Sequence, residues 1–382
     1  MIDVPEQRAI ISGIGMSDVG RRLGVAPLNL TVAASREAIE DAGITPADVD
    51  GIATMGDTPV ADAAAALDIA PVDHGVGVAD GGLLSPLMSA ILAVADGRAR
   101  HVLVYRTVQM MGGTISAAPA GRASAAASVM GDMGPLLAAH SYSAANWLAM
   151  HCRRHMHLYG TTHEQLGWLA VTSRAHAALN PLAAYREPIT LADHRDARPV
   201  SSPFGLLDCD VPIDGSVAVV VSAAEHSSSC PQPPVRIEAM GRADGAGGWT
   251  GRIDYPKMAS IEAAADMWSR TELRPADVDL AQLYDGFTFL TFAWLEALGL
   301  CEEGGAGPYV EGGTRIGLDG ELPLNTYGGQ LSAGRMHGYW LLHEACLQLR
   351  GEAGARQVGE RPEVAIAAAG GGPIAGCLLL TR

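Results

Sequence analysis

The chain has 382 residues, of which 48% are hydrophobic and 18% are charged, and its formal net charge is −16. This length holds one large domain or two fused units, and the composition is typical of a globular protein with an extensive core. The acidic excess, without any cluster of Lys and Arg, argues against binding to nucleic acid or to an anionic membrane surface.

The cysteines and the N-terminus indicate the compartment. Six cysteines are scattered along the chain without a C-x-x-C pair, which predicts reduced thiols rather than a disulfide framework or a metal cage. The first residues, MIDVPEQRAII, lack the basic region and the long apolar core of a signal peptide. No apolar run reaches the roughly 18 residues that span a bilayer. We therefore expect a cytoplasmic protein without a metal or other cofactor.

The first half of the chain alternates short apolar runs with helical segments. One run ends in Gly13-Ile14-Gly15, but it lacks the third glycine of the dinucleotide-binding fingerprint. The sequence PADVD at 46–50 precedes a strand, and GGLLS at 81–85 opens a helix. The predicted elements are strand Ala9–Ile14, helix Asn29–Ala42, strand Gly51–Thr54, helix Pro86–Ala95 and strand Val102–Tyr105.

The same elements recur later, which indicates an internal duplication. PADVD repeats at 275–279, 229 residues after its first copy (275 − 46), and GGQLS at 328–332 follows GGLLS by 247 residues (328 − 81). Strands and helices joined by crossover connections predict parallel sheets between helices. The second copy comprises strand Val235–Met240, helix Ile261–Trp268, strand Leu280–Leu283, helix Leu341–Arg350 and strand Val364–Ala368.

A long insertion separates the two copies. We assign residues 1–106 and 213–226 to the first half, 107–212 to the insertion and 235–382 to the second half. Strand Val217–Val221 is expected to complete the first half. The insertion is predicted to hold a flexible tract (Gly112–Gly131), two helices (Ala139–Tyr159 and His163–Leu179) and a turn (Ser201–Gly205).

Three motifs have counterparts in a known family. The segment LDCD at 207–210, followed by DGSVAV at 214–219, resembles the LDC…DGAAAV segment of thiolases. AGGGP at 369–373 resembles their final Cys-Gly-Gly-Gly loop, and GGQLSAGRMHG at 328–338 resembles GGxxxxGHPxG. The resemblance covers nearly the whole chain. It implies an α/β protein with the thiolase fold, a duplicated five-layered αβαβα sandwich with a loop domain inserted in the first half.

The catalytic positions depart from the thiolase pattern. Ala79 stands where the nucleophilic cysteine would be, and Ala369 stands at the second cysteine. Arg335 replaces the histidine of GHPxG, and Tyr284 replaces the Asn or His of the fourth motif. Acyl transfer through an enzyme thioester needs a thiolate and a base, so these substitutions argue against thiolase activity.

The words YDGFTF at 284–289 and GGQLSAGRMHGYW at 328–340 resemble the lipid-transfer-protein-type steroid side-chain aldolases, which have lost the thiolase cysteines. This resemblance implies retro-aldol cleavage of a β-hydroxyacyl-CoA whose hydroxyl lies on the steroid D-ring. The products would be a 17-keto steroid and propionyl-CoA.

A retro-aldol step needs a base for the hydroxyl proton, a group that holds the enolate oxygen, and an acid for Cα. We expect Tyr284 and Tyr339 to be the proton-transfer pair in an order that the sequence leaves open, with His337 assisting catalysis. Lys257, the only lysine, is not a convincing Schiff-base residue. Backbone amides of Ala79 and of Gly371 or Gly372 are expected to form the enolate hole. The other expected substrate contacts are Asp80, Gly329, Arg335 and Tyr327.

The family resemblance also implies partners. We expect a homodimer that binds the acyl-CoA-binding subunit of the preceding hydratase, a zinc-ribbon and OB-fold protein, to form a heterotetramer. The small number of basic residues available for the CoA phosphates favours such a partner. Two alternatives remain open: a non-catalytic acyl-CoA- or lipid-binding subunit, and a thiolase or ketoacyl synthase that uses Cys209 or Cys301.

Overall fold

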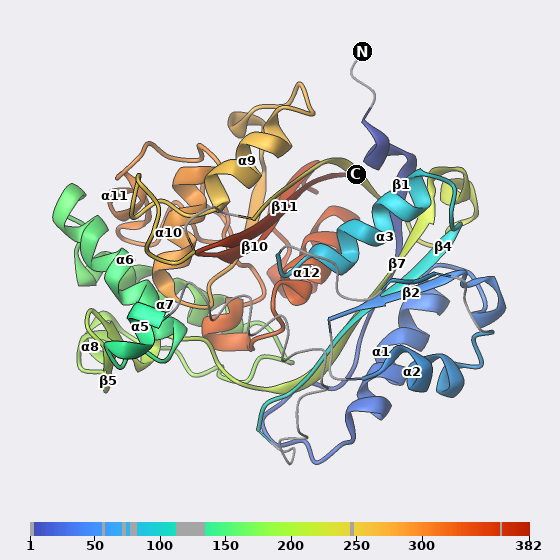
Figure 1. The fold of residues 1–382 in the computed structure, drawn as a ribbon, viewed down its shortest axis with the longest axis horizontal. Helices are drawn as coiled ribbons and strands as arrows, with labels where there is room; N and C mark the ends of the chain where they lie inside the picture. The colour runs from blue at the N-terminus through green and yellow to red at the C-terminus, as the bar shows by residue number, and fades with distance from the viewer. Residues whose placement is uncertain are drawn as a thin grey trace.

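A single mixed sheet runs through the molecule. The computed structural model describes residues 4–55, 58–70, 74–76, 82–111, 134–244, 248–359 and 361–382. In these ranges nine strands pair in the order β3-β2-β4-β7-β1-β8-β11-β10-β9 (Figure 1). The strands are β1 (Ala9–Met16), β2 (Gly51–Thr54), β3 (His74–Val76), β4 (His101–Gln109), β7 (Asp214–Ala223), β8 (Val235–Asp244), β9 (Leu280–Leu283), β10 (Val364–Gly371) and β11 (Ile374–Thr381).

Helices form three layers around this sheet. Helices α1 (Pro27–Asp41) and α2 (Val60–Leu67) lie on the outer side of the first half, where α1 packs on β1, β7 and β4. Helices α9 (Ser260–Trp268) and α10 (Thr288–Ala297) cover the outer side of the second half. Helices α3 (Ser85–Ala95) and α12 (Tyr339–Arg350) lie in the middle, and α12 contacts strands of both halves (Figure 1). The expected layered α/β sandwich is therefore present.

The two halves are joined edge to edge. Strand β1 pairs with β8 through Ile10–Arg236 and Ile11–Val235, which makes the two half-sheets continuous. Arg350 at the end of α12 reinforces the joint, because its guanidinium binds the Asp41 carboxylate at 2.6 Å. Asp41 also accepts a hydrogen bond from the backbone of Ile14 on β1. A partly buried ion pair thus connects the central helix of one half to the outer helix of the other.

The duplication is visible in backbone detail. Both PADVD segments begin with a 3₁₀ turn, Pro46–Asp48 and Pro275–Asp277, and each turn leads into a strand. Gly13 on β1 and Gly241 on β8 let the first helix of each half approach its strand. A Cβ atom would lie 2.1 Å from the Ala38 carbonyl oxygen in the first case and 1.9 Å from that of Ala263 in the second.

One expectation needs correction. The sheet is not parallel throughout: β2–β3, β2–β4 and β9–β10 are parallel, whereas the other strand pairs are antiparallel. One cause is the two-residue turn Gly372-Pro373, which folds β11 directly back on β10. The GGQLS segment differs from GGLLS in local structure, although the helix expected at Leu341–Arg350 is present. Gly329–Ala333 forms one π-helical turn, and α12 begins later, at Tyr339.

The insertion packs beside the second half. It contains α5 (Gly134–Ala138), α6 (Ala144–Tyr159), α7 (His163–Ala178), α8 (Leu191–Arg195) and the short pair β5 (Pro199–Ser201) and β6 (Phe204–Gly205). Helix α7 contacts α10 and α11 (Ala306–Val310), and α6 contacts α10. The predicted flexible tract, Gly112–Gly131, lies outside the described residues. In the described part of the chain, no helix is both long and apolar enough to cross a membrane.

The close contact at Gly241 gives a test of the packing. We expect Gly241→Ala to push α9 away from β8 and to lower the free energy of unfolding by about 1–3 kcal/mol, measured by urea denaturation. Gly134→Ala is the matched control, because a Cβ atom at that position meets no atom within 4 Å. Equal stability of the two variants would contradict the proposed packing.

Candidate active site

A cavity of about 240 Å³ lies beside the ends of β9 and β10, the segment before α12 and the start of α6. One part of its wall is polar and consists of Asp210, Tyr284, Arg335 and His337. The rest of the wall is mainly apolar, with Leu83, Leu148, Trp249, Phe287, Leu290 and Ile374. An apolar wall with a few converging polar groups is typical of a small-molecule site.

Tyr284 follows β9 directly and is held in place by its neighbours. Its backbone N–H donates to the carbonyl of Ala368 on β10 at 2.9 Å, which continues the parallel ladder. Gly286 leaves room for the ring, since a Cβ atom there would lie 2.7 Å from Tyr284 Cε1. Burial raises the pKa of Tyr284, the nearby Asp210 carboxylate raises it further, and Arg335 lowers it. The phenol is therefore protonated at neutral pH and is suited to donate a proton.

Asp285 is completely buried and binds the loop that contains Gln330 and Leu331. Its carboxylate accepts hydrogen bonds from the backbone amides of Gln330, at 2.8 Å, and Leu331, at 3.4 Å. Gly329 is required for this contact, because a Cβ atom there would lie 1.9 Å from Asp285 Oδ2. Burial raises the pKa of Asp285 to about 7, although these amide bonds lower it. Gly329 thus supports the loop against Asp285 and is not among the described residues of the cavity wall.

Asp210 and Arg335 form an ion pair on the cavity wall. Arg335 Nη1 lies 3.3 Å from Asp210 Oδ2, and its other nitrogens face the Met110 sulfur at 3.1–3.3 Å. Burial raises the pKa of Asp210 to about 6, and Arg335 opposes this shift. The backbone N–H of Asp210 donates to the Gly286 carbonyl at 3.1 Å. The carboxylate is therefore fixed next to the segment that carries Tyr284.

His337 is positioned by a second arginine. It has a left-handed backbone with φ of 53°, and its Nδ1 atom lies 2.9 Å from Nη2 of Arg106. A guanidinium group only donates hydrogen bonds, so Nδ1 accepts and the proton of the neutral ring is on Nε2. His337 therefore presents Nδ1 to Arg106, and its side chain lines the cavity.

Most of the other predicted site residues do not line the cavity in the described part of the chain. Tyr339 is completely buried at the start of α12, and Tyr327 is completely buried against Trp340, with ring centroids 5.2 Å apart. Neither tyrosine is among the described residues of the cavity wall. Gly371 lines the cavity, whereas the N–H of Gly372 donates to the Met258 sulfur. Ala79 and Asp80 lie outside the described residues.

Sequence reasoning did not identify Asp210 as a site residue. The only local signal was its place in the LDCD motif, four residues before the start of the strand that completes the first half, β7 (214 − 210). The bridge between Cys209 and Phe287 brings this motif beside YDGF.

Comparisons with known proteins identify the family. Residues 250–378 match the family described as thiolase C-terminal domain-like. The chain is 34% identical to the steroid side-chain-cleaving aldolase of Thermomonospora curvata, with 97% of each chain covered. It is 35% identical to the 17-hydroxy-3-oxo-4-pregnene-20-carboxyl-CoA lyase of Mycobacterium tuberculosis, with 97% of this chain and 99% of the relative covered. The chain belongs to the steroid side-chain-cleaving aldolases of the thiolase superfamily.

Solved structures agree with this assignment. The structure titled Ltp2-ChsH2(DUF35) aldolase matches with a TM-score of 0.90 and 33% identity over 98% of both chains. A monomeric SCP2-thiolase-like protein from Mycobacterium smegmatis matches with a TM-score of 0.71 and 17% identity, over 100% of this chain and 78% of that one. The thiolase fold expected from the motifs is confirmed.

Two thiols of this aldolase are the alternative candidates for a nucleophile. Cys209 and Cys301, the alternative nucleophiles, are both absent from the described cavity wall. Burial raises the pKa of each thiol to about 12, so neither is a thiolate at neutral pH. At the former second cysteine position, Ala369 packs next to Gly338, where a Cβ atom would lie 2.5 Å from its methyl group. A cysteine-based mechanism therefore has no support in the described residues.

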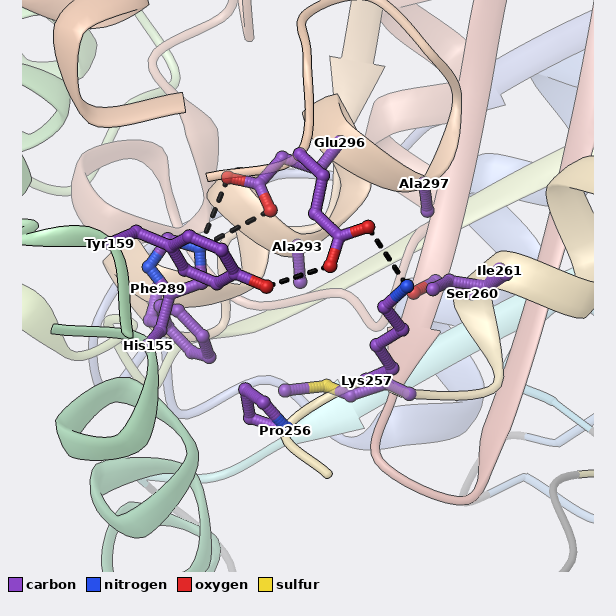
Figure 2. A pocket seen from close by; sticks show the side chains of 12 residues that line it. His155, Tyr159, Pro256, Lys257, Ser260, Ile261, Phe289, Ala293, Glu296 and Ala297 are labelled. Carbon is purple, nitrogen blue, oxygen red and sulfur yellow. Dashed lines mark hydrogen bonds and ion pairs between the residues drawn. The ribbon is translucent and has the colours of Figure 1, made fainter. Parts of the chain in front are cut away.

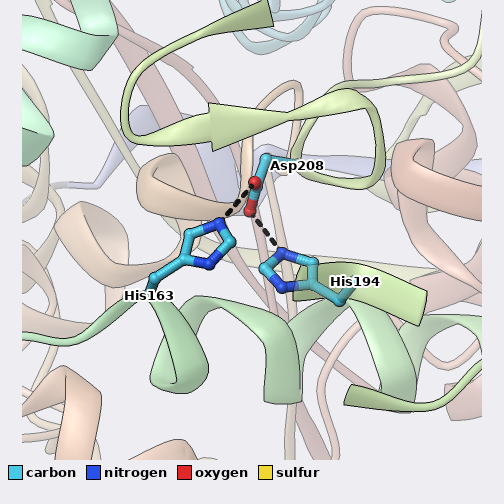
Figure 3. Close-up of side chains that lie close together, drawn as sticks. All are labelled: His163, His194 and Asp208. Atoms are coloured by element: carbon cyan, nitrogen blue, oxygen red, sulfur yellow. Dashed lines mark hydrogen bonds and ion pairs between the residues drawn. The ribbon is translucent and has the colours of Figure 1, made fainter. Parts of the chain in front are cut away.

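Asp208, two residues before Asp210, accepts hydrogen bonds from several elements, and we call this cluster the Asp208 hub (Figure 3). Asp208 Oδ1 accepts hydrogen bonds from His194 and from Thr288 at the start of α10, both at 2.8 Å. Oδ2 accepts from the Gly205 amide at 2.8 Å and from His163 at 3.4 Å. Two histidines and an aspartate also bind metal ions in proteins, but here all four acceptor positions of the carboxylate are occupied. The hub connects α7, α8 and α10 behind the cavity wall.

Lys257 lies in a separate, small pocket of about 70 Å³ (Figure 2). It pairs with Glu303 at 2.9 Å, and Glu303 also accepts the Tyr159 hydroxyl at 2.7 Å. His155 binds Glu296 in the same pocket at 3.1 Å. Helix α10 separates the two spaces, because Leu290 faces the larger cavity and Phe289 the smaller one. The lysine is therefore committed to an ion pair outside the candidate active site.

The hub can be tested through stability. Burial raises the pKa of Asp208, but hydrogen bonds from His163 and His194 outweigh this effect and hold the pKa below its usual range. In Asp208→Asn, an amide N–H₂ replaces an acceptor and faces these donors. We expect unfolding to become easier by about 2 kcal/mol, as measured by thermal and urea denaturation at pH 7. Asp319→Asn, at an exposed carboxylate, is the control and should leave stability unchanged.

Proposed function

We propose that this chain cleaves the side chain of a steroid acyl-CoA by a retro-aldol reaction. The substrate is a 17-hydroxy-steroid-22-oyl-CoA, and the products are a 17-keto steroid and propionyl-CoA. The composition of the cavity wall supports this function best. Tyr284 and the Asp210–Arg335 ion pair line the cavity, and no described residue of the wall is a cysteine. Both curated relatives carry names that denote cleavage of this kind.

The polar wall supplies what a retro-aldol step requires. Breaking the bond between the hydroxyl carbon and Cα leaves an enolate of the thioester, whose oxygen becomes negative. Arg335 and His337 both line the cavity, and preformed donors in a partly dry site stabilise such a charge strongly. Gly370 and Gly371 let the thioester approach the wall closely. Tyr284 supplies a phenol for proton transfer.

The apolar wall suits the steroid part of the substrate. Trp249, Phe287 and Leu290 offer a hydrophobic surface next to Tyr284, and Leu83 and Ile374 extend it. Burial of fused hydrocarbon rings on such a surface provides binding energy without the need for many polar contacts. The reactive carbon would then lie at the junction of the apolar and polar parts of the cavity.

We place this enzyme in the cytoplasm, in a complex. The matching solved structure is titled as an aldolase together with ChsH2(DUF35). We propose a homodimer that binds an acyl-CoA-binding subunit with an OB fold and a zinc ribbon, giving a heterotetramer. The net charge of −16 supports this assignment, since a partner that holds the CoA phosphates relieves the chain of doing so.

A non-catalytic lipid- or acyl-CoA-binding subunit is the competing proposal. A binding scaffold has no use for a buried phenol beside a buried carboxylate and a guanidinium, and burial of such groups has a cost in free energy. The arrangement of Tyr284, Asp210 and Arg335 therefore favours an enzyme.

The two tyrosines allow a matched test of this function. Incubation with a 17-hydroxy-steroid-22-oyl-CoA, with and without the partner subunit, should release the 17-ketone, detected by mass spectrometry. We expect Tyr284→Phe to lower kcat by about 10²–10⁴-fold, because it removes a proton-transfer group. Tyr339→Phe removes a phenol in the core and should change kcat little. Comparable losses in both variants, with folding intact, would contradict this assignment and restore Tyr339 to the reaction.

A further inference from the structure

We infer that a second cavity, at the start of β4, binds a phosphate group through Arg100, Arg8, His101 and His226. This binding site goes beyond the proposed carbon–carbon cleavage and does not depend on it, so its tests use the intact protein without a steroid substrate.

The cavity has a volume of about 530 Å³ and lies where the start of β4 meets the ends of α3 and β7. It is separate from the candidate active site. His101 begins β4, and Arg106, whose guanidinium contacts His337 of that site, lies five residues further along the strand (106 − 101), which is about 16 Å. The wall combines small apolar side chains with six polar ones: Arg8, Arg100, His101, Glu225, His226 and Ser229.

The wall carries positive charge in a protein whose net charge is −16. Arg8, at the end of the 3₁₀ turn Pro5–Arg8, and Arg100, just before β4, bring two guanidinium groups to it. Glu225 is the single carboxylate among the described residues of the wall. Within the described ranges, the guanidinium of Arg100 takes part in no hydrogen bond or ion pair. Its planar N–H groups therefore remain available for an oxyanion, whose paired oxygens they match.

His226 stands next to His101, with the two ring centroids 4.7 Å apart and the rings edge to face. Nε2 of His226 lies 3.0 Å from the carbonyl oxygen of Ala42. A carbonyl oxygen only accepts hydrogen bonds, so Nε2 carries the proton of the neutral ring and Nδ1 does not.

A chain of buried hydroxyls sets the proton of His101 in the same way. The Ser12 hydroxyl donates to the carbonyl of Val220 at 3.2 Å and lies 2.7 Å from the Ser222 hydroxyl. Because Ser12 has used its one proton, Ser222 donates to Ser12 and accepts from Nδ1 of His101, at 2.8 Å. The Nε2 atom of the neutral ring thus has no proton, and it gains one where a negative charge stabilises the imidazolium.

An anion fits this wall better than a metal ion does. Imidazole and carboxylate groups also bind divalent metals, but two guanidinium groups on the same wall repel a cation. Among the described residues, His163, His194 and Asp208 are the three whose ligand atoms all lie within 4.8 Å of one another. The ligand atoms of the histidines and the carboxylate of this cavity do not converge in that way.

The size of the cavity indicates the ligand class. Its volume lies within the roughly 300–1,000 Å³ of small-molecule sites, which leaves room for an organic group beside the anion. The ligand is therefore a phosphate dianion, either free or as the monoester of a small molecule.

Proton uptake should accompany binding. Burial lowers the pKa of His101, and the neighbouring His226 and Arg100 lower it further, whereas Asp50 and Asp48 raise it. A dianion in the cavity favours the imidazolium form and opposes the first three effects. The bound state then holds more protons than the free state, so the affinity rises as the pH falls toward the depressed pKa of His101. The other charged groups of the described wall are Arg8 and Glu225.

Sulfate is the probe for this linkage, because its charge stays at −2 between pH 8 and pH 6, whereas phosphate takes up a proton within this range. We expect isothermal titration calorimetry at constant ionic strength, adjusted with NaCl, to show saturable sulfate binding whose affinity rises about ten-fold from pH 8 to pH 6. Absence of saturable binding at roughly 10 mM sulfate would overturn the inference. An affinity that does not change with pH would remove His101 from the site.

Charge variants locate the site. We expect Arg100→Gln to weaken sulfate binding by about ten-fold, because it removes a charged hydrogen-bond donor, and Arg100→Lys to recover part of the affinity. Arg195→Gln removes the same charge at an exposed position outside the cavity, and it should bind sulfate as the wild type does. Equal affinities of Arg100→Gln and Arg195→Gln would contradict the site. Arg100 is exposed, and urea denaturation shows that each variant is folded.

Two phosphate ligands distinguish the source of the dianion. Inorganic phosphate and glycerol 3-phosphate are compared by the same calorimetry at pH 8, where both are mainly dianions. Tighter binding of glycerol 3-phosphate assigns the site to a monoester, and equal or weaker binding assigns it to the free ion. Binding of neither would overturn the inference. These measurements contain no steroid acyl-CoA, so their failure would leave the proposed aldolase function unaffected.

Discussion

The geometry of the cavity depends on one contact, the Asp285 carboxylate on the backbone amides of Gln330 and Leu331. Asp285 adjoins Tyr284, and the π-helical turn that it holds leads to Arg335 and then to His337. A buried carboxylate without these amides would be very unfavourable, so the loop and the strand end are fixed relative to each other. Gly329 is also needed for this contact, because any Cβ atom there would collide with Asp285.

The duplicated scaffold explains why the groups of this site come from distant parts of the chain. Strands β9 and β10 bring Tyr284 and Gly371 to one end of the second half-sheet. The insertion of the first half contributes Asp210, and the Asp208 hub anchors that segment to α10. Continuity of the sheet through β1 and β8 keeps the two halves in register. The site is therefore shared between the halves, as expected when a fused pair of units closes around a substrate.

Several strands and one residue of the site were predictable from local sequence patterns. Gly51–Thr54 and Leu280–Leu283 are strands with the predicted bounds, because four buried residues after a PADVD turn leave few other conformations. Tyr284 lines the cavity as its motif position indicated. Tyr339 shows the limit of such reasoning, since a motif position gives no information about which side of a helix start faces the cavity. Asp210 lies 74 residues before Tyr284 (284 − 210), and only the fold brings them together.

The Asp210–Arg335 pair also bears on how the site tolerates a negative intermediate. Arg335 lies 3.3 Å from the Asp210 carboxylate on the described cavity wall. An enolate that forms in the cavity therefore meets a cation that the fold already holds in place, and no ion has to be brought in from water to stabilise it. A thiolase reaches its intermediate through a sulfur nucleophile. The described wall of this cavity has no cysteine, and the fixed guanidinium stabilises negative charge without one.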